Sequence, residues 1–217
     1  MINKLNVDAS RASLDLYLIY TDPSGEIAKE KLKSTEKLLL DFDEYMKSPT
    51  SSNKILFKTY QKRIEALIHN MKSFFDINTY LYEKFPIKFI KYKNNSLAAL
   101  FTGICSSDTY NTFKLTSRQR ASKVITSMVL PVIKLFNGYF DSEIKYYGVS
   151  VCYTCKDFSS ESASTYDGEV LYFISPTQII KKFKNGDITE DEIVQKSDIF
   201  IYDNESLGLK KVKITLE

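Results

Sequence analysis

One stretch of this sequence repeats its apolar residues with the spacing of a long, one-sided helix. From residue 57 onward these side chains recur after three or four residues, and finally after seven: Phe57, Tyr60, Ile64, Leu67, Met71, Phe74 and Leu81. This spacing places them on one helical face, with Asn78 at the missing heptad position. We therefore expect a helix over about 54–82, packed either inside its own bundle or against a second copy of the chain.

A second helix is expected over about 116–137. Thr116 and Gln119 have the spacing of a capping box, in which each side chain bonds the other residue's backbone N–H. Pro131 lies within the apolar pattern and predicts a kink about one turn earlier, because proline has no N–H to donate. Among the N-terminal segments, 26–46 has a helical apolar stripe, whereas 11–21 fits a helix or a strand.

The middle of the chain predicts a pair of strands. Residues 87–93 alternate apolar and charged side chains, and Asn94 and Asn95 have turn chemistry before the apolar run 97–104. These segments indicate a hairpin, while a short helix over 96–104 stays open as an alternative. Residues 105–115 are expected to form a polar loop.

The C-terminal third has the character of a sheet. Strands are expected at about 144–156, 170–174, 198–203 and 211–216. Between them, Ser175 is expected to cap a helix that Pro176 opens and Gly186 ends. Thr189 and Glu192 form another capping box at the start of a short helix.

These elements together predict an α+β protein. Its helical N-terminal half would pack with a mainly antiparallel C-terminal sheet, because helices and strands are segregated along the chain. A length of 217 residues suits a single domain over 1–217. A subdivision into a mainly helical part, 1–140, and a strand-rich part, 141–217, stays open.

Composition excludes several kinds of active site. His69 is the single histidine, so multi-histidine metal sites are excluded. The seven glycines include no Gly-x-Gly, which excludes the dinucleotide fingerprint and the glycine-rich phosphate loop. We therefore expect no cofactor.

The three cysteines form no framework of regular spacing. Cys152 and Cys155 make a C-x-x-C, but residues three apart on a strand point to opposite faces. Ordinary buried thiols are the expectation, with a zinc site from these two, Cys105 and His69 as the alternative. An odd number of cysteines, without a signal peptide or an apolar membrane-spanning run, predicts a cytoplasmic protein.

A weak catalytic pattern lies at the start of the strand expected at 144–156. Glu143 and Lys145 form an E-x-K, in which a carboxylate could hold Mg²⁺ and a lysine could steady the attacking water. Such sites need a further acid on a neighbouring strand, for which Asp108 and Asp141 are the candidates. The alternative is a pair of ordinary charged residues at a strand entry.

Charge is unevenly distributed along the chain. Residues 54–134 contain 14 basic and 4 acidic residues, a balance of +10, whereas the whole chain has a net charge of +3. Four of these cations surround the start of the second helix: Lys114, Arg118, Arg120 and Lys123. Because cations are disfavoured at a helix N-terminus, their presence there suggests a bound anion. The alternative is a solvated face.

A second basic segment mixes lysines with aromatic residues. Residues 84–93 interleave four lysines with Phe85, Phe89 and Tyr92. Such a pattern can follow a nucleic-acid strand by charge and stacking, or it can be an amphipathic strand with a buried aromatic face.

The sequence favours a binding module over an enzyme. We expect a non-catalytic interaction protein that self-associates through helices or binds a protein partner, with a basic middle suited to nucleic acid or acidic protein. The alternatives are a Mg²⁺-dependent, carboxylate-based hydrolase or nuclease, and a regulatory subunit of a larger complex.

Overall fold

The computed structural model describes residues 53–74, 79–81, 87–136, 143–159, 167–203 and 208–216. The segments 11–21 and 26–46, for which we made predictions above, lie outside these ranges. No helix in the described ranges is both long enough and apolar enough to span a membrane.

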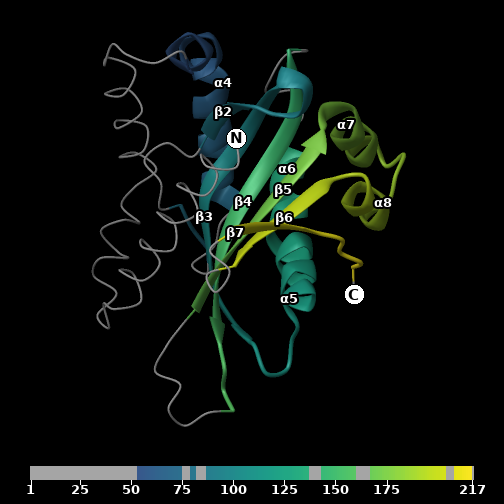
Figure 1. The fold of residues 1–217 in the computed structure, drawn as a ribbon. Helices are drawn as coiled ribbons and strands as arrows, with labels where there is room; N and C mark the ends of the chain where they lie inside the picture. The colour runs from purple at the N-terminus through teal and green to yellow at the C-terminus, as the bar shows by residue number, and fades with distance from the viewer. Residues whose placement is uncertain are drawn as a thin grey trace, which may run out of the picture.

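The described chain is an α+β fold built on one mixed sheet (Figure 1). Its strands are β1 (Thr79–Leu81), β2 (Ile87–Lys91), β3 (Leu97–Asn111), β4 (Ile144–Lys156), β5 (Asp167–Pro176), β6 (Asp198–Asp203) and β7 (Gly208–Val212). The order across the sheet is β1-β3-β4-β5-β6-β7, and β2 also pairs with β3. The helices are α4 (Asn53–Phe74), α5 (Ser117–Val124), α6 (Leu130–Leu135), α7 (Thr177–Asn185) and α8 (Glu190–Gln195).

Strand directions confirm a mainly antiparallel sheet with one parallel pair. β3 and β4 run parallel, and every other pairing in the described chain is antiparallel. A parallel pair needs a crossover connection, which the helical segment from α5 to α6 provides. The hairpin of β2 and β3 is confirmed, with Asn94 of its turn in the left-handed conformation at φ 52°.

Two predicted boundaries before the crossover are wrong. The helix expected over 54–82 ends at Phe74, and Thr79–Leu81 instead forms β1, paired with residues 104–106 of β3. The loop expected over 105–115 begins only after Asn111, because β3 continues along β4 as far as that residue. In both places, backbone pairing with a distant strand overrides the local pattern.

The helix after the crossover loop begins and bends where the sequence predicts. Thr116 and Gln119 form the expected capping box. Ahead of Pro131, residues Ile125–Val129 form a π-helical segment, in which the N–H of Leu130 bonds the Ile125 carbonyl. This single wide turn accommodates the proline, whose missing N–H would otherwise interrupt the α-helical ladder.

Among the C-terminal helices, the predicted end of α7 and the predicted start of α8 are confirmed, whereas the predicted start of α7 is wrong. The left-handed Gly186, at φ 81°, ends α7, and Thr189 with Glu192 caps α8. Ser175 is not a helix cap, since it is buried within β5 and α7 begins at Thr177. The last strand lies earlier than the expected 211–216, because Gly208–Val212 is the segment that pairs with β6.

The sheet has a different environment on each face. The buried apolar residues of the described helices, including Ile64, Val124 and Ile180, belong to one cluster with the strand residues on one face of the sheet, here called the first face. The second face contributes a smaller cluster of strand residues together with Tyr92. Between the strands, the backbone is so close-packed that a Cβ on Gly148 would lie 2.7 Å from the Leu100 side chain.

A polar node sits at one end of the second face. The Asp198 carboxylate accepts a hydrogen bond of 2.8 Å from the Tyr92 hydroxyl and pairs with Lys93 and Lys211 at 2.5 Å each. The node thereby ties the β2–β3 turn to β6 and β7.

Candidate functional site

The parallel strands β3 and β4 end side by side, which brings the two segments that follow them to the same end of the sheet. Asn111 and Lys156 are the last register partners of β3 and β4, and the Thr112 N–H donates to the Lys156 carbonyl at 3.0 Å. Beyond this point β3 leads through a short loop into α5, and β4 continues into residues 157–159. The carboxyl ends of parallel strands are a common place for ligand sites, because the adjoining loops meet there.

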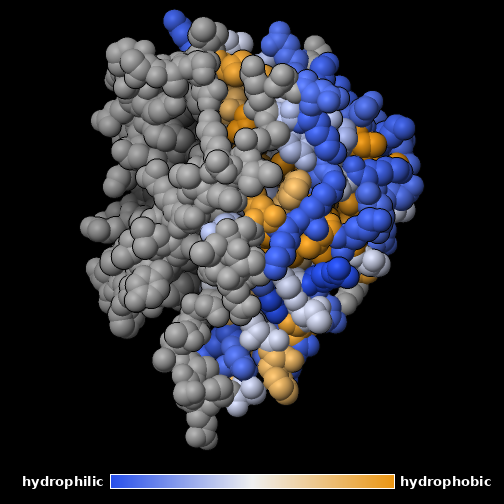
Figure 2. Space-filling view, in the orientation of Figure 1, coloured by the Kyte–Doolittle hydropathy of each residue, from blue (hydrophilic) through white to orange (hydrophobic). Residues whose placement is uncertain are grey.

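Two exposed phenylalanines stand on these two segments. Phe113 is 73% exposed and Phe158 is 55% exposed, and they are the large apolar side chains most open to solvent in the described chain. Each lies two residues past the last register pair, so both project from the same end of the sheet. Figure 2 shows a largely hydrophilic surface over α7 and α8, with smaller hydrophobic areas between.

Both phenylalanines are held in hydrogen-bonded turns. The Asn111 side-chain oxygen accepts from the N–H groups of Phe113 at 2.9 Å and Lys114 at 3.2 Å. The Asp157 carboxylate accepts from the N–H and hydroxyl of Ser159 at 2.8 and 2.6 Å. These bonds also keep the pKa of Asp157 below its usual value. The two aromatic rings are therefore presented on ordered turns rather than on loose loops.

Cations lie along the segments that carry the two aromatic rings. Lys114, Arg118 and Lys123 are exposed along the loop and the first turns of α5. The ammonium of Lys156 lies 5.5 Å from the centre of the Phe158 ring, within cation–π range. We call the exposed Phe113, Lys114, Arg118 and Phe158, together with the half-buried Lys156, the aromatic–basic edge.

An open cleft of about 670 Å³ adjoins this edge. The start of α5 forms one side, and Ile201, Lys210 and Val212 of β6 and β7 form the other. Glu169 and Cys155 are also part of the lining. The volume falls within the usual range for small-ligand sites.

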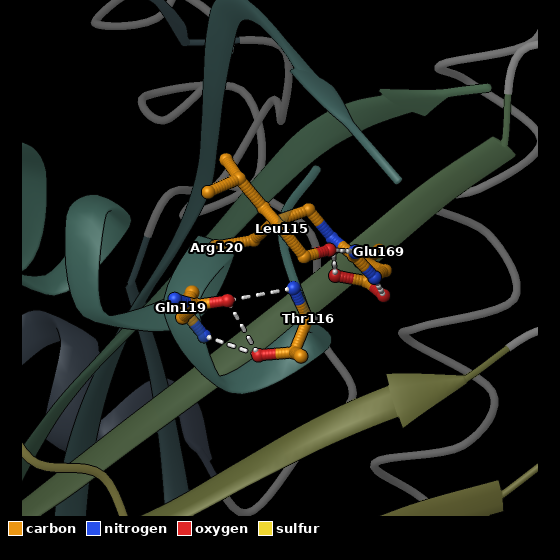
Figure 3. A network of polar contacts seen from close by, with 5 residues as sticks. All are labelled: Leu115, Thr116, Gln119, Arg120 and Glu169. Carbon is orange, nitrogen blue, oxygen red and sulfur yellow. Dashed lines mark hydrogen bonds and ion pairs between the residues drawn. The ribbon is translucent and has the colours of Figure 1, made fainter. Parts of the chain in front are cut away.

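Arg120 lies inside the protein at this cleft. It donates to both carboxylate oxygens of Glu169, from Nε at 3.2 Å and from a terminal nitrogen, and it donates to the Leu115 carbonyl at 2.5 Å (Figure 3). Burial disfavours its charge, but Glu169 outweighs that effect and raises the pKa of Arg120. The expected anion-binding set therefore loses Arg120, whose guanidinium already has an internal partner.

The thiol in the cleft lining, that of Cys155, is held in its neutral form. Burial, with the nearby charge of Glu169, raises the pKa of the Cys155 thiol to about 12. At neutral pH the thiol is protonated, and it is not an activated nucleophile. Within the described ranges, no three His, Cys, Asp or Glu side chains are grouped so that they could hold a metal ion.

The E-x-K residues lie far from this edge. Glu143 and Lys145 are exposed at the beginning of β4, whereas Asp108 precedes Thr109, which pairs with Thr154 near the end of that strand. Nine residues of strand separate the two positions, about 30 Å. The structure therefore does not bring Asp108 to Lys145, and Asp141 lies outside the described residues.

The cysteines do not assemble into one site. Cys152 packs in the cluster on the second face with Cys105, its register partner, while Cys155 packs on the first face. All three are free and buried. Opposite faces separate the C-x-x-C pair as the strand periodicity predicts, and the side chain of His69 lies outside the described residues.

Those of the other apolar and aromatic candidates whose side chains the structure describes are part of the core. Tyr60, Ile64 and Leu67 of α4 are buried within this chain, so this part of the stripe is not open to a second copy. Phe89 is buried with its ring centre 5.7 Å from that of Tyr60. Sequence reasoning overlooked Phe113 and Phe158, whose signal was an aromatic residue beside Asn or Asp in a polar segment.

Comparison with known protein families, curated proteins and solved structures found no match to this chain. Any assignment of function must therefore come from the geometry described above.

Proposed function

We propose that this protein is a non-catalytic binding module whose aromatic–basic edge takes single-stranded nucleic acid. The observation that carries the proposal is the pair of exposed rings, Phe113 and Phe158, held in hydrogen-bonded turns among cations. Unpaired bases stack on aromatic side chains, and their phosphates attract lysine and arginine. A duplex hides the faces of its bases, so the single-stranded form fits this surface better.

The alternative, an acidic protein surface, accounts for less of what is present. It would neutralise the cations, but covering both exposed rings would require apolar side chains that acidity alone does not supply. The hydrogen-bonded turns that carry both rings also favour a binding role, because turns that are already formed reduce the entropy lost on association. Two acids at the same end, Asp108 and Asp157, limit how close a phosphate comes and leave the cations of α5 as the favoured contacts.

The test is fluorescence anisotropy with labelled single-stranded RNA, single-stranded DNA and duplex DNA at two salt concentrations. We expect the single strands to bind more tightly than the duplex. Salt should weaken binding, and the logarithm of the association constant should fall with the logarithm of the salt concentration with a slope of about −0.7 per phosphate neutralised. Phe113→Ala and Phe158→Ala should each weaken binding by about 5- to 150-fold, the range for one stacked base. Because both rings are exposed, the melting temperature should stay unchanged.

A control removes more charge elsewhere than Arg118→Ala removes at the aromatic–basic edge. Lys181 and Lys184 are exposed on α7, which begins at the opposite end of β5 from the aromatic–basic edge (Figure 1). Changing both to alanine should leave affinity within about twofold, whereas Arg118→Ala should weaken binding and reduce the salt slope. Absence of binding at low salt would contradict the proposal, as would equal binding by the Phe113→Ala variant.

A further inference from the structure

The cleft beside the aromatic–basic edge points to a second contact with the same ligand. We propose that this cleft binds one unpaired nucleotide unit, with its base against Leu115, Ile201 and Val212 and its phosphate toward Arg118 and Lys210. The inference rests on the proposed function and extends it from the exposed rings to the neighbouring open cleft.

The cleft and the edge share their supporting segments. Thr112 and Leu115 line the cleft, and Phe113 and Lys114 lie between them on the same loop. Asp157 lines the cleft as well, and Phe158 follows it directly. A strand that crosses the two rings therefore passes the mouth of the cleft.

The lining has the chemistry of a nucleotide. Leu115, Ile201 and Val212 give an apolar wall for a flat base, while Arg118 and Lys210 are cations suited to a phosphate. The structure shows no ion pair for Arg118 in the part it describes, so its guanidinium is open to a ligand. Two acids line the cleft: Glu169 is already neutralised by Arg120, whereas the charge of Asp157 disfavours a phosphate beside it and leaves Arg118 and Lys210 as the phosphate contacts.

The size of the cleft agrees with such a ligand. At about 670 Å³ it is much larger than a gap left by one side chain, and it lies within the range of pockets that take small organic ligands. An inserted base would add apolar burial to the stacking supplied by the exposed rings.

The experiment uses the full chain and a single-stranded oligonucleotide with 2-aminopurine at successive positions. This base fluoresces more strongly once it leaves the base stack, so one position should brighten on binding. Val212→Phe fills the cleft and should abolish the increase and weaken binding at least about fivefold. Leu209→Phe is the matched control, because Leu209 is on the same strand but packs with the cluster on the opposite face.

A second measurement covers the case in which Val212→Phe disturbs folding. Arg118 is exposed, so Arg118→Ala should leave the melting temperature unchanged. Titration with adenosine 5′-monophosphate distinguishes the source of the nucleotide: binding that Arg118→Ala weakens indicates a free mononucleotide, and binding of the strand alone indicates a unit within a polymer. Either result supports the subsite if a 2-aminopurine position brightens.

Failure of this inference and failure of the proposed function give different results. If the oligonucleotide binds through Phe113 and Phe158, but Val212→Phe folds without altering affinity and no position brightens, the subsite is overturned alone. If the wild-type protein binds no oligonucleotide at low salt, the proposed function falls and the inference falls with it.

Discussion

Replacing Glu169 with alanine is expected to lower the free energy of unfolding by about 3–5 kcal/mol, the range for breaking one side of a buried ion pair. The side chains of Arg120 and Glu169 are only 8% and 15% exposed. Without Glu169, the guanidinium keeps one described hydrogen bond, to the Leu115 carbonyl, and a buried charge loses its counter-charge. The large cost comes from that uncompensated charge rather than from the loss of one favourable contact.

The same reasoning predicts that removing both partners is tolerated better than removing one. Two methionines in place of Arg120 and Glu169 have no charge to desolvate, so the double variant should regain most of the lost stability. A matched control is Glu190→Ala, which removes an exposed partner 3.5 Å from Lys134. That change should cost no more than about 1 kcal/mol.

Urea unfolding followed by circular dichroism measures these differences. With a slope of about 2 kcal/mol per molar, a loss of about 4 kcal/mol moves the midpoint by about 2 M. The reasoning is refuted if Glu169→Ala costs less than about 1 kcal/mol, or if the double variant is as unstable as the less stable single variant.

Four further substitutions test other features of the fold. Tyr153→Phe removes a fully buried hydroxyl for which the described residues offer no hydrogen bond of good geometry, so thermal melts should show unchanged or slightly increased stability. Tyr92→Phe, in contrast, removes a bond to a charged acceptor and should cost about 1.5–3 kcal/mol in the same melts. Gly148→Ala should cost about 1–3 kcal/mol, because the new Cβ would overlap its neighbours, and a wild-type melting temperature would contradict this. Burial raises the pKa of Asp198, but bonds from Lys211, Lys93 and Tyr92 outweigh it and lower the pKa overall. The stabilisation by the Asp198 carboxylate is therefore fully present above the unfolded-state pKa and is lost as the pH falls toward the lower pKa of the folded state. Between pH 2 and 6, the free energy of unfolding should depend less on pH in Asp198→Asn than in the wild type.

The features that the sequence predicts best are those settled within a few residues. Both confirmed capping boxes join residues three apart, and Gly186 ends α7 through its own left-handed backbone. The disturbance before Pro131 likewise follows from a single missing N–H. Such features depend on local chemistry, so knowledge of the rest of the fold adds little to them.

The features that were missed depend on distant partners. β1 becomes a strand because β3, about 25 residues further along, supplies its hydrogen bonds. Arg120 carries the same charge as Arg118 in the sequence, and only Glu169, 49 residues away, distinguishes a buried ion pair from an exposed cation. Exposure decides the candidate site in the same way. Phe113 and Phe89 are chemically alike, and only the packing shows which ring faces solvent.

The π-helical segment makes the length of its helix as important as its composition. One residue advances an α-helix by about 100°, so the wide turn at Ile125–Val129 sets the rotation of α5 relative to α6. Deleting one residue there would restore regular α-helical hydrogen bonding, but it would rotate α5 relative to α6 and so change which side of α5 packs on the sheet. Arg120 would then point away from Glu169, and the wall of the cleft would turn with it. In the evolution of this protein, the segment should therefore accept substitutions far more readily than insertions or deletions.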